Sequence, residues 1–393
     1  MKRIYLDHAA TTCVSNEVMQ EMLPYFTNIY GNANSQHAFG SDAHVAVEKA
    51  RAQIADLIGA KPGEIYFTSG GTEADNWAVR GVCQAYKEKG KHLIISKIEH
   101  PAMLTTCKEL IKEGFEVSFV GVDSEGIINL TELESLIRKD TIFIGCMFAN
   151  NEIGTIQPIE EIAQIAKKHG VICFTDAVQA TGAINFNVKE LGVDMLSFSS
   201  HKFNGPKGVG VLYVRNGLKL GSIITGGHQE RSRRGGTTNV PGVVGCAHAL
   251  KLCRESLDDD NRLIQRLRDH FISRVESEIP YVKLNGSREK RLPSNANFSF
   301  YFIEGESILM MLDIEGIAVS SGSACSSDSL DPSHVLLAIG VPVEYAHGTI
   351  RFSFGKENTL EEVDYVVDKL KEIIKKLREM SPLFKLGSEV KNV

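Results

Sequence analysis

Short runs of apolar residues recur along the first part of the chain and alternate with longer amphipathic stretches. The runs contain few polar positions, as is typical of strands that are covered on both faces of a sheet. We predict strands at 64–68 (EIYFT), 92–96 (HLIIS), 116–122 (EVSFVGV), 141–149 (TIFIGCMFA), 170–176 (GVICFTD), 194–200 (DMLSFSS) and 208–214 (GVGVLYV).

The stretches between these runs carry apolar residues at helical spacing. In 158–170, Ile159, Ile162 and Ile165 share one face, basic residues close the helix and Gly170 ends it. Alternating strands and helices predict an α/β fold with a mostly parallel, doubly wound sheet. Ligands of such sheets bind beyond the carboxyl ends of the strands, so the residues that follow each run are the first candidates for a site.

The pattern changes after about residue 257. The acidic segment 257–263 leads into a charged helix, 292–302 and 348–355 predict strands, and 359–379 predicts an amphipathic helix. These elements predict a second, smaller α+β domain. We place a large domain at 12–257 and the small domain at 1–11 and 258–393.

Composition narrows the class of protein. The chain has 393 residues, of which 43% are hydrophobic and 23% charged, as in a globular protein with a large core. The net charge of -6 favours neither nucleic acid nor an anionic membrane. Eight cysteines without a C-x-x-C pair argue against a disulfide framework and a zinc ribbon, and for a reducing, cytoplasmic setting. We find no signal peptide or transmembrane segment and expect an enzyme.

Two polar residues at strand ends suggest a cofactor. Lys202 follows the run 194–200; it is either a solvated turn residue or a lysine in an enclosed pocket, where it can form a Schiff base with an aldehyde. Asp176 ends another strand, where it could simply cap a helix. Together they suit pyridoxal 5'-phosphate (PLP), whose ring nitrogen needs an acidic partner.

Three further strand ends add weaker signals. Ser69-Gly70-Gly71-Thr72 precedes a helix and could cradle a phosphate, although such a turn alone is weak evidence. His100 follows a fourth strand, where a lone histidine is more often structural. Asn150-Asn151 follows a fifth, where it could cap a helix. Convergence of all five on one rim favours a PLP site.

The sequence resembles the NifS/IscS-type cysteine desulfurases of the class V aminotransferase family, PLP-dependent enzymes with the aspartate aminotransferase-like fold type I. The matching stretches follow the family order from residue 5 to residue 355, and SSGSAC marks the long-loop subclass. They include YLDHAATT, FTSGGTEADNWA, NNEIGTIQPI, TDAVQATG, SSHKFNGPKG, GGHQERSRRGGTTNVPG, SSGSACSSDSLDPSHVL and IRFSFG.

The resemblance implies a role for each matched position. Lys202 would hold PLP and remove the substrate Cα proton, and His100 would stack on the ring and move protons to or from the substrate thiol. Arg351 would bind the substrate carboxylate. The remaining cofactor contacts would come from Asp176 (ring nitrogen), Gln179 (phenolic oxygen), Asn151 (cofactor oxygen and substrate), Gly71, Thr72, Ser199 and His201 (phosphate), and Thr237 (the partner subunit's phosphate, which implies a homodimer).

Cys325 lies among small polar residues, in a loop at about 321–333 where no core needs a cysteine. The resemblance implies that it accepts sulfur from L-cysteine as a persulfide and leaves L-alanine. The persulfide would be passed to a sulfur-acceptor protein such as an iron–sulfur cluster assembly scaffold, and residues 380–393 are a candidate partner surface. The alternative is that Cys325 is an unreactive loop cysteine without a catalytic role.

Other functions remain open at this point. A selenocysteine lyase or another PLP-dependent Cβ-lyase would share the fold, and a binding or scaffold protein could keep it without the chemistry. The cluster Arg231, Arg233 and Arg234 could suggest RNA, but three arginines in a glycine-rich loop better fit an anionic pocket or a dimer seam. We therefore expect no direct nucleic-acid or membrane partner and no metal.

Overall fold

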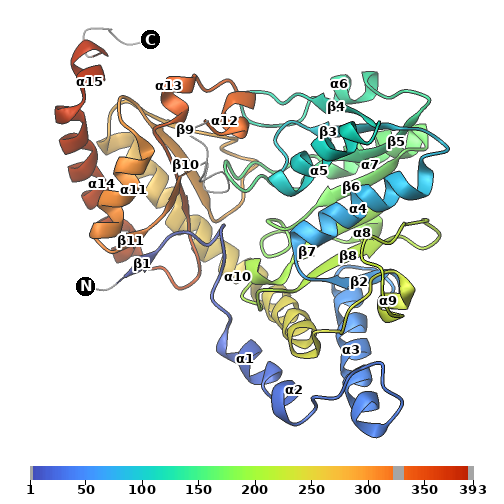
Figure 1. Ribbon diagram of the computed structural model, residues 1–393. Helices are drawn as coiled ribbons and strands as arrows, with labels where there is room; N and C mark the ends of the chain where they lie inside the picture. The colour runs from blue at the N-terminus through green and yellow to red at the C-terminus, as the bar shows by residue number, and fades with distance from the viewer. Residues whose placement is uncertain (1–2, 322–331, 388–393) are drawn as a thin grey trace.

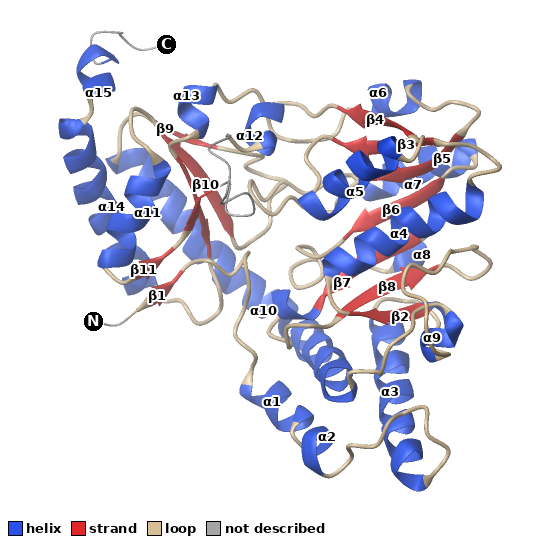
Figure 2. Ribbon diagram, viewed as in Figure 1, coloured by secondary structure: helices blue, strands red, loops and turns tan. Residues whose placement is uncertain are grey.

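The structure, a computed structural model, describes residues 3–321 and 332–387. A seven-stranded sheet and a four-stranded sheet lie side by side, each with its own helices (Figures 1 and 2). The strands of the large sheet are β2 Ile65–Thr68, β3 His92–Ser96, β4 Glu116–Val120, β5 Thr141–Gly145, β6 Ile172–Asp176, β7 Met195–Ser199 and β8 Gly210–Val214.

Each of the seven predicted strand segments contains one strand of the large sheet. The spatial order is β2-β8-β7-β6-β5-β3-β4. β8 is antiparallel to both of its neighbours, whereas the other neighbouring pairs are parallel. The prediction of a mostly parallel sheet is therefore confirmed.

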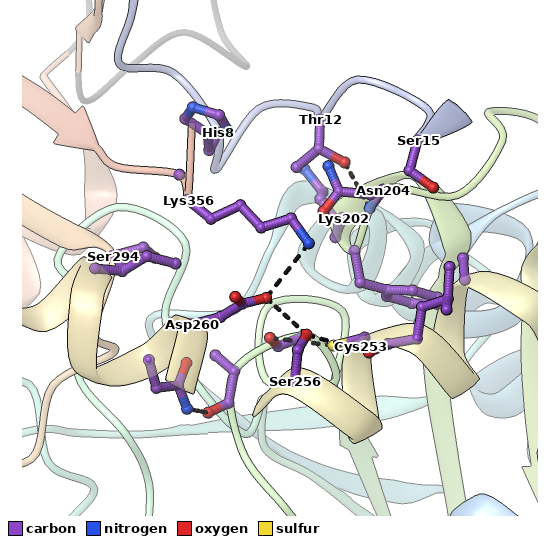
Figure 3. Close-up of a pocket in the computed structure, with 18 of the residues that line it drawn as sticks. His8, Thr12, Ser15, Lys202, Asn204, Cys253, Ser256, Asp260, Ser294 and Lys356 are labelled. Carbon is purple, nitrogen blue, oxygen red and sulfur yellow. Dashed lines mark hydrogen bonds and ion pairs between the residues drawn. The ribbon is translucent and has the colours of Figure 1, made fainter. Parts of the chain in front are cut away.

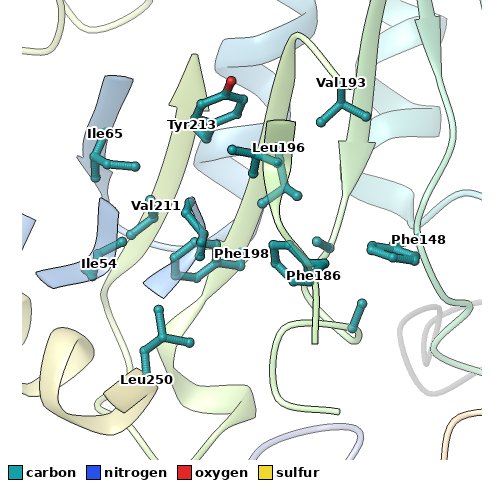
Figure 4. Packing of buried hydrophobic residues seen from close by; sticks show 14 of the residues in the cluster. Ile54, Ile65, Phe148, Phe186, Val193, Leu196, Phe198, Val211, Tyr213 and Leu250 are labelled. Carbon is teal, nitrogen blue, oxygen red and sulfur yellow. The ribbon is translucent and has the colours of Figure 1, made fainter. Parts of the chain in front are cut away.

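Helices cover both faces of this sheet. Successive side chains of a strand point to opposite faces, so Phe143 packs in the core under α4 and α5, whereas Ile144 packs in the core under α3, α7, α8 and α10. Figure 4 shows the second core, with Phe198 and Val211 of the sheet near Ile54 of α3 and Leu250 of α10. The helices are α3 Ala38–Leu57, α4 Gly71–Tyr86, α5 Pro101–Lys112, α7 Ile159–His169, α8 Val188–Leu191 and α10 Val240–Glu278.

One expectation for the large sheet is wrong. We expected every strand to be covered on both faces, but β4 forms an edge of the sheet and Glu116 is exposed, while Val117 and Phe119 are only partly buried. An edge position alone does not explain this, since β2 at the opposite edge is buried in all four residues; the faces of β4 receive less cover than those of β2.

The small sheet has the order β12-β13-β10-β9 and is antiparallel. Phe271, Phe298 and Phe352 are fully buried between this sheet and helices α10, α11 and α14. The predicted strands 292–302 and 348–355 contain β10 and β13, and the helix predicted at 359–379 is α14. The elements are β9 Val282–Leu284, β10 Asn295–Phe300, β12 Ser320–Ser321, β13 Thr349–Ser353, α11 Gly305–Ile314 and α14 Leu360–Met380.

α10 connects the two parts as one unbroken helix. It runs through residue 257, so the predicted domain boundary falls inside a helix, and the domain limits stay a prediction. No helix in the described ranges has an apolar stretch long enough to cross a bilayer. The other elements are β1 Ile4–Tyr5, β11 Ile317–Ala318, α1 Asn16–Met22, α2 Pro24–Thr27, α6 Leu130–Ser135, α9 Gln229–Ser232, α12 His334–Ala338, α13 Val343–Ala346, α15 Pro382–Gly387 and the short 3-10 helices η1 Pro62–Glu64 and η2 Ser200–Lys202.

Candidate active site

A cavity of about 320 Å³ lies beyond the carboxyl ends of β2, β3, β5, β6 and β7, as the doubly wound sheet predicts. Arg351 reaches it from β13 of the small sheet, so the cavity joins the two parts of the molecule. Ten of the predicted site residues line it: Gly71, Thr72, His100, Asn151, Asp176, Gln179, Ser199, His201, Lys202 and Arg351.

Lys202 lies in η2, directly after β7, and its side chain is anchored by the N-terminal segment. Its Nζ donates to the carbonyl oxygens of Ala9 at 2.6 Å and Ala10 at 2.7 Å. The Ala9 carbonyl also accepts a hydrogen bond from Gln179 Nε2 at 2.9 Å. Two predicted cofactor contacts are therefore held by backbone carbonyls of the matching stretch YLDHAATT, whose residues had no predicted role.

Asp176 ends β6 and is 5% exposed at the wall of the cavity. Its Oδ1 accepts a hydrogen bond from the Val178 N–H at 2.8 Å. Burial raises the pKa of Asp176 to about 6, although the Val178 amide and Lys202 act in the opposite direction. A buried carboxylate with a raised pKa gains stability from a cationic partner, so it fits the protonated ring nitrogen of PLP.

The start of α4 fits a phosphate group. Its N-cap is Gly70, which has no side chain to cap the first turn, and helix N-termini attract anions. A Cβ on Gly71 would lie 2.7 Å from Val178 Cγ2, so only glycine lets the backbone approach so closely here. Hydroxyl groups of Thr72 and Ser199 line the same cavity. Together with Asp176 and Lys202, these groups fit PLP.

His100 and His201 are both neutral near pH 7. Burial, together with the charge of Lys202, lowers the pKa of each to about 4. His100 caps α5 and its Nδ1 accepts a hydrogen bond from the Ala102 N–H at 3.1 Å. The neutral ring of His100 therefore carries its hydrogen on Nε2. His201 Nδ1 is 3.0 Å from Thr11 Oγ1.

Arg351 is 4% exposed, and two of its nitrogen atoms are fixed. One terminal nitrogen donates to the carbonyl oxygen of Asn151 at 3.0 Å, and the other pairs with Asp7 Oδ1 at 2.9 Å. Its Nε has no partner among the described residues. The guanidinium thus keeps hydrogen-bonding capacity for an anion.

Comparison with known proteins identifies the family. The family model described as aminotransferase class-V matches residues 4–366. The chain belongs to this family. A cysteine desulfurase IscS from Dictyoglomus turgidum is 53% identical over 383 residues, which cover 97% of each chain. A cysteine desulfurase IscS from Methanosarcina thermophila is 51% identical over 382 residues, covering 97% of this chain and 94% of the relative.

Solved structures agree with this class-V aminotransferase assignment. A NifS-like protein superposes with a TM-score of 0.91 at 41% identity, over 96% of this chain and all 100% of its own. A structure titled SspA in complex with cysteine has a TM-score of 0.81 at 34% identity and covers 91% of this chain and 100% of that chain. The predicted fold type I is confirmed.

One predicted residue of the class-V aminotransferase site that the structure describes is not brought to the cavity. Thr237 is exposed and lies outside it. Its loop is held to α4 by Arg234, which makes a bidentate ion pair with Glu73, and Arg231 donates to the carbonyl oxygen of Ile65. Arg231 and Arg234 are therefore engaged in contacts within this chain. Cys325 lies outside the described residues.

Sequence reasoning missed two buried carboxyl groups beside this class-V aminotransferase cavity. Asp75 of α4 is 1% exposed and accepts a hydrogen bond from Ser197 Oγ at 2.5 Å. Glu99 is fully buried, and its Oε1 accepts from the Met147 N–H at 2.6 Å. Burial, together with the nearby Asp176, raises the pKa of both groups, that of Glu99 to about 8. Glu99 directly follows the apolar run HLIISKI, and a carboxylate beside such a run is the sequence signal that predicts a buried carboxyl group.

A second cavity of about 370 Å³ lies on another side of Lys202 (Figure 3). It shares Ala9, Gln179 and Lys202 with the first cavity. Asp260 accepts hydrogen bonds here from Lys356 Nζ at 3.4 Å and Ser256 Oγ at 2.8 Å, as the dashed lines in Figure 3 show. In this member of the family, Lys202 is therefore bordered by cavities on two sides.

Proposed function

We propose that this chain is a PLP-dependent cysteine desulfurase, which converts L-cysteine to L-alanine and transfers the sulfur to Cys325 as a persulfide. One observation carries the proposal: ten residues from distant parts of the sequence line one cavity with the donor set that PLP and an α-amino acid need. About 50% identity to relatives named cysteine desulfurase IscS, over nearly the whole chain, supports the choice of reaction.

The cofactor would be held at both ends. Lys202 would bind the aldehyde carbon, Asp176 would pair with the ring nitrogen, and Gln179 and Asn151 would contact the phenolic oxygen of the ring. Gly71 and Thr72 at the start of α4, together with Ser199 and His201, would hold the phosphate. When bound, PLP supplies an electron sink for charge that develops at the substrate Cα.

The chain's own residues bind the substrate and move its protons. Arg351 and Asn151 bind the α-carboxylate, and Lys202 Nζ removes the Cα proton. The carbonyl oxygens of Ala9 and Ala10 keep that amine at the cavity wall. His100 acts as a hydrogen-bond donor to the substrate sulfur, because its Nδ1 is occupied by the Ala102 amide and its hydrogen is on Nε2.

Sulfur transfer needs an accessible thiolate. The Cys325 thiolate attacks the substrate sulfur, so an S–S bond forms, the Cβ–S bond breaks and its electron pair stays with the carbon fragment, which is then protonated to L-alanine. Among the described cysteines, five are buried in the cores, and burial raises the pKa of their thiols. Cys253 lines the second cavity with a raised pKa, and Cys13 is exposed but lines neither cavity.

Cys325→Ala tests the assignment. We expect the variant to bind PLP and L-cysteine but to form alanine at least 100-fold more slowly, because substrate sulfur has no acceptor. Alanine release and a trapped protein persulfide are measured for wild type, Cys325→Ala and Cys13→Ser, the matched exposed cysteine, which should behave as wild type. Wild-type alanine formation by Cys325→Ala would contradict desulfuration through Cys325 and favour a direct Cβ-lyase; preferential turnover of selenocysteine would favour a selenocysteine lyase.

The proposed enzyme is a homodimer. The region from α1 to α3 protrudes from the rest of the chain (Figure 1), and six of its apolar side chains are exposed. Monomers seldom expose a patch of apolar side chains unless a partner covers it. The six exposed side chains are Met19, Leu23, Phe26, Tyr30, Phe39 and Val45. Thr237, which lies outside its own cavity, would contact the partner's cofactor phosphate.

The persulfide would then serve a second protein in the cytoplasm. The chemistry requires an acceptor thiol, and an iron–sulfur cluster assembly scaffold is the acceptor that the resemblance to the NifS/IscS-type family implies. Met380 and Leu383, at the start of the predicted surface 380–393, are 72% and 58% exposed. They offer apolar contact area to such a partner.

A further inference from the structure

Residues 7–10, which we call the strap, lead from the small sheet to the large one. Asp7 pairs with Ser353 of β13 in a parallel bridge, and the Ala9 N–H donates to Ser353 Oγ at 2.9 Å. The strap is thus fixed to β13 two residues beyond Arg351, and the chain then continues across to α1 (Figure 1).

The strap contacts three side chains of the proposed site. Asp7 Oδ1 pairs with Arg351, the Ala9 carbonyl accepts from Gln179 and Lys202, and the Ala10 carbonyl accepts from Lys202. These three side chains come from β13, the turn after β6 and η2. One short segment therefore holds both the residue for the substrate carboxylate and the residue for its Cα proton.

Asp7 is the charged element of the strap. Arg351 is nearly inaccessible, and a buried guanidinium is costly unless a carboxylate and further acceptors satisfy it. Asp7, whose side chain is 20% exposed, supplies that carboxylate, and the Asn151 carbonyl supplies the second acceptor. Two acceptors on two terminal nitrogens fix the plane of the guanidinium, which has five N–H donors in a rigid fork.

We propose that Asp7 is a positioning residue. It orients Arg351 for the α-carboxylate of the substrate and, through the strap, fixes the position of Arg351 relative to Lys202. The proposal rests on the proposed function. It makes Asp7 a determinant of α-amino acid binding although it need not touch the reacting atoms.

Binding of ligands with and without a carboxylate to the PLP-loaded enzyme tests the proposal. We expect Asp7→Ala to raise KM for L-cysteine and the dissociation constant of L-alanine about tenfold, the effect of one charge-assisted hydrogen bond, with kcat changed less than about twofold. The dissociation constant of ethylamine, which lacks the carboxylate, should not change. Ligand binding is followed through the visible absorption of the cofactor.

Two further variants make the result specific. Asp7→Asn keeps an acceptor for Arg351 but loses the charge, so it should weaken L-alanine binding by an intermediate factor, and it carries the test if Asp7→Ala does not fold. Tyr5→Phe removes hydrogen bonds from the Tyr5 hydroxyl to the carbonyls of Asp7 and Thr11, so it disturbs the same segment while sparing the ion pair. It should leave the ratio of L-alanine to ethylamine affinity unchanged.

The possible failures can be told apart. Equal weakening of L-alanine and ethylamine by the Asp7 variants would show that the strap is merely structural, and tighter L-alanine binding would show that Asp7 competes with the substrate; either result overturns the inference. The proposed function fails separately, if wild type forms no alanine from L-cysteine or if Arg351→Ala binds L-alanine as wild type does.

Discussion

At the scale of single residues, the site is built from ionisable groups whose charge is set by burial. Asp75, Glu99 and Asp176 lie close enough for the charge of one to raise the pKa of the others. Three neighbouring buried carboxyl groups cannot all be ionised near neutral pH, because their negative charges repel one another, so some of them stay protonated. Burial raises the pKa of Asp176 to about 6, against about 8 for Glu99, and Lys202 acts in the opposite direction on the pKa of Asp176. Asp176 is therefore the carboxyl best suited to remain ionised against a cationic ring.

The variant Glu99→Gln tests whether Glu99 is protonated in the folded protein. An unfolded glutamate has a pKa near 4.3, whereas Glu99 has a pKa of about 8, so between these values folding takes up a proton. The stability that Glu99 contributes is complete below about pH 4.3 and falls by up to ~1.4 kcal/mol per pH unit as the pH rises towards 8. Gln copies the protonated carboxyl and does not titrate.

We therefore expect Glu99→Gln to match wild type near pH 4 and to become progressively more stable than wild type as the pH rises to 8. Denaturant unfolding at several pH values measures the difference. The control is Glu109→Gln in α5, where the Glu109 side chain is 47% exposed, and this variant should show no such trend. A constant difference between Glu99→Gln and wild type across this range would show that Glu99 is ionised in the folded protein.

At the scale of elements, sequence predicted those parts that depend on side-chain patterns. Strands β5 and β6 were predictable because both of their faces are covered, so nearly every residue is apolar. Their carboxyl ends then located Asp176 and Asn151. The roles of Ala9 and Ala10 could not be predicted, because they depend on backbone carbonyls and leave no trace in residue type. Asp7 lies in the matching stretch YLDHAATT, but its pairing with Arg351, 344 positions away, could not be predicted from that stretch.

A prediction at this scale concerns the position of helix α4, which depends on the glycine turn that joins it to β2. Gly71→Ala is compatible with the backbone, but its Cβ would meet Val178 Cγ2 at 2.7 Å and displace the start of α4. Such overpacking costs about 1–3 kcal/mol, so we expect about tenfold weaker PLP binding by the apoprotein. Spectroscopic titration of the apoprotein with PLP measures this.

Two matched variants control the Gly71 experiment. Gly63→Ala, just before β2, places its Cβ in open space and should bind PLP as wild type does. Val178→Ala combined with Gly71→Ala removes the colliding methyl group and should restore part of the affinity. Undiminished PLP binding by Gly71→Ala alone would mean that the start of α4 does not cradle the phosphate.

At the scale of the whole molecule, sequence patterns separated a large α/β part from a smaller α+β part, and the two sheets follow that division. The 39-residue α10 was not predicted as one helix, because its acidic middle, with Asp258, Asp259 and Asp260, interrupts the apolar face that a pattern would follow. Only the folded structure shows that this solvent-facing stretch bridges two cores.

The largest-scale prediction concerns the second subunit. Phe26 is 56% exposed on the protruding α2, and a homodimer would bury it, so Phe26→Asp should place a charge in an apolar interface. We expect light scattering to give about the mass of one chain, 43.2 kDa, where wild type gives about twice that. The control is Ile314→Asp: Ile314, in α11, is 77% exposed on the small-sheet side, and its substitution should leave the mass unchanged.

Loss of the dimer should also weaken PLP binding, because Thr237 reaches only the partner's cofactor in the proposed assembly. A Phe26→Asp monomer that binds PLP as tightly as wild type would separate the two claims: the interface would be right and the role of Thr237 wrong. A dimer that survives Phe26→Asp would instead move the interface away from the region between α1 and α3. In the first case the exposed position of Thr237, which is not among the residues that line its own chain's cavity, would need another explanation.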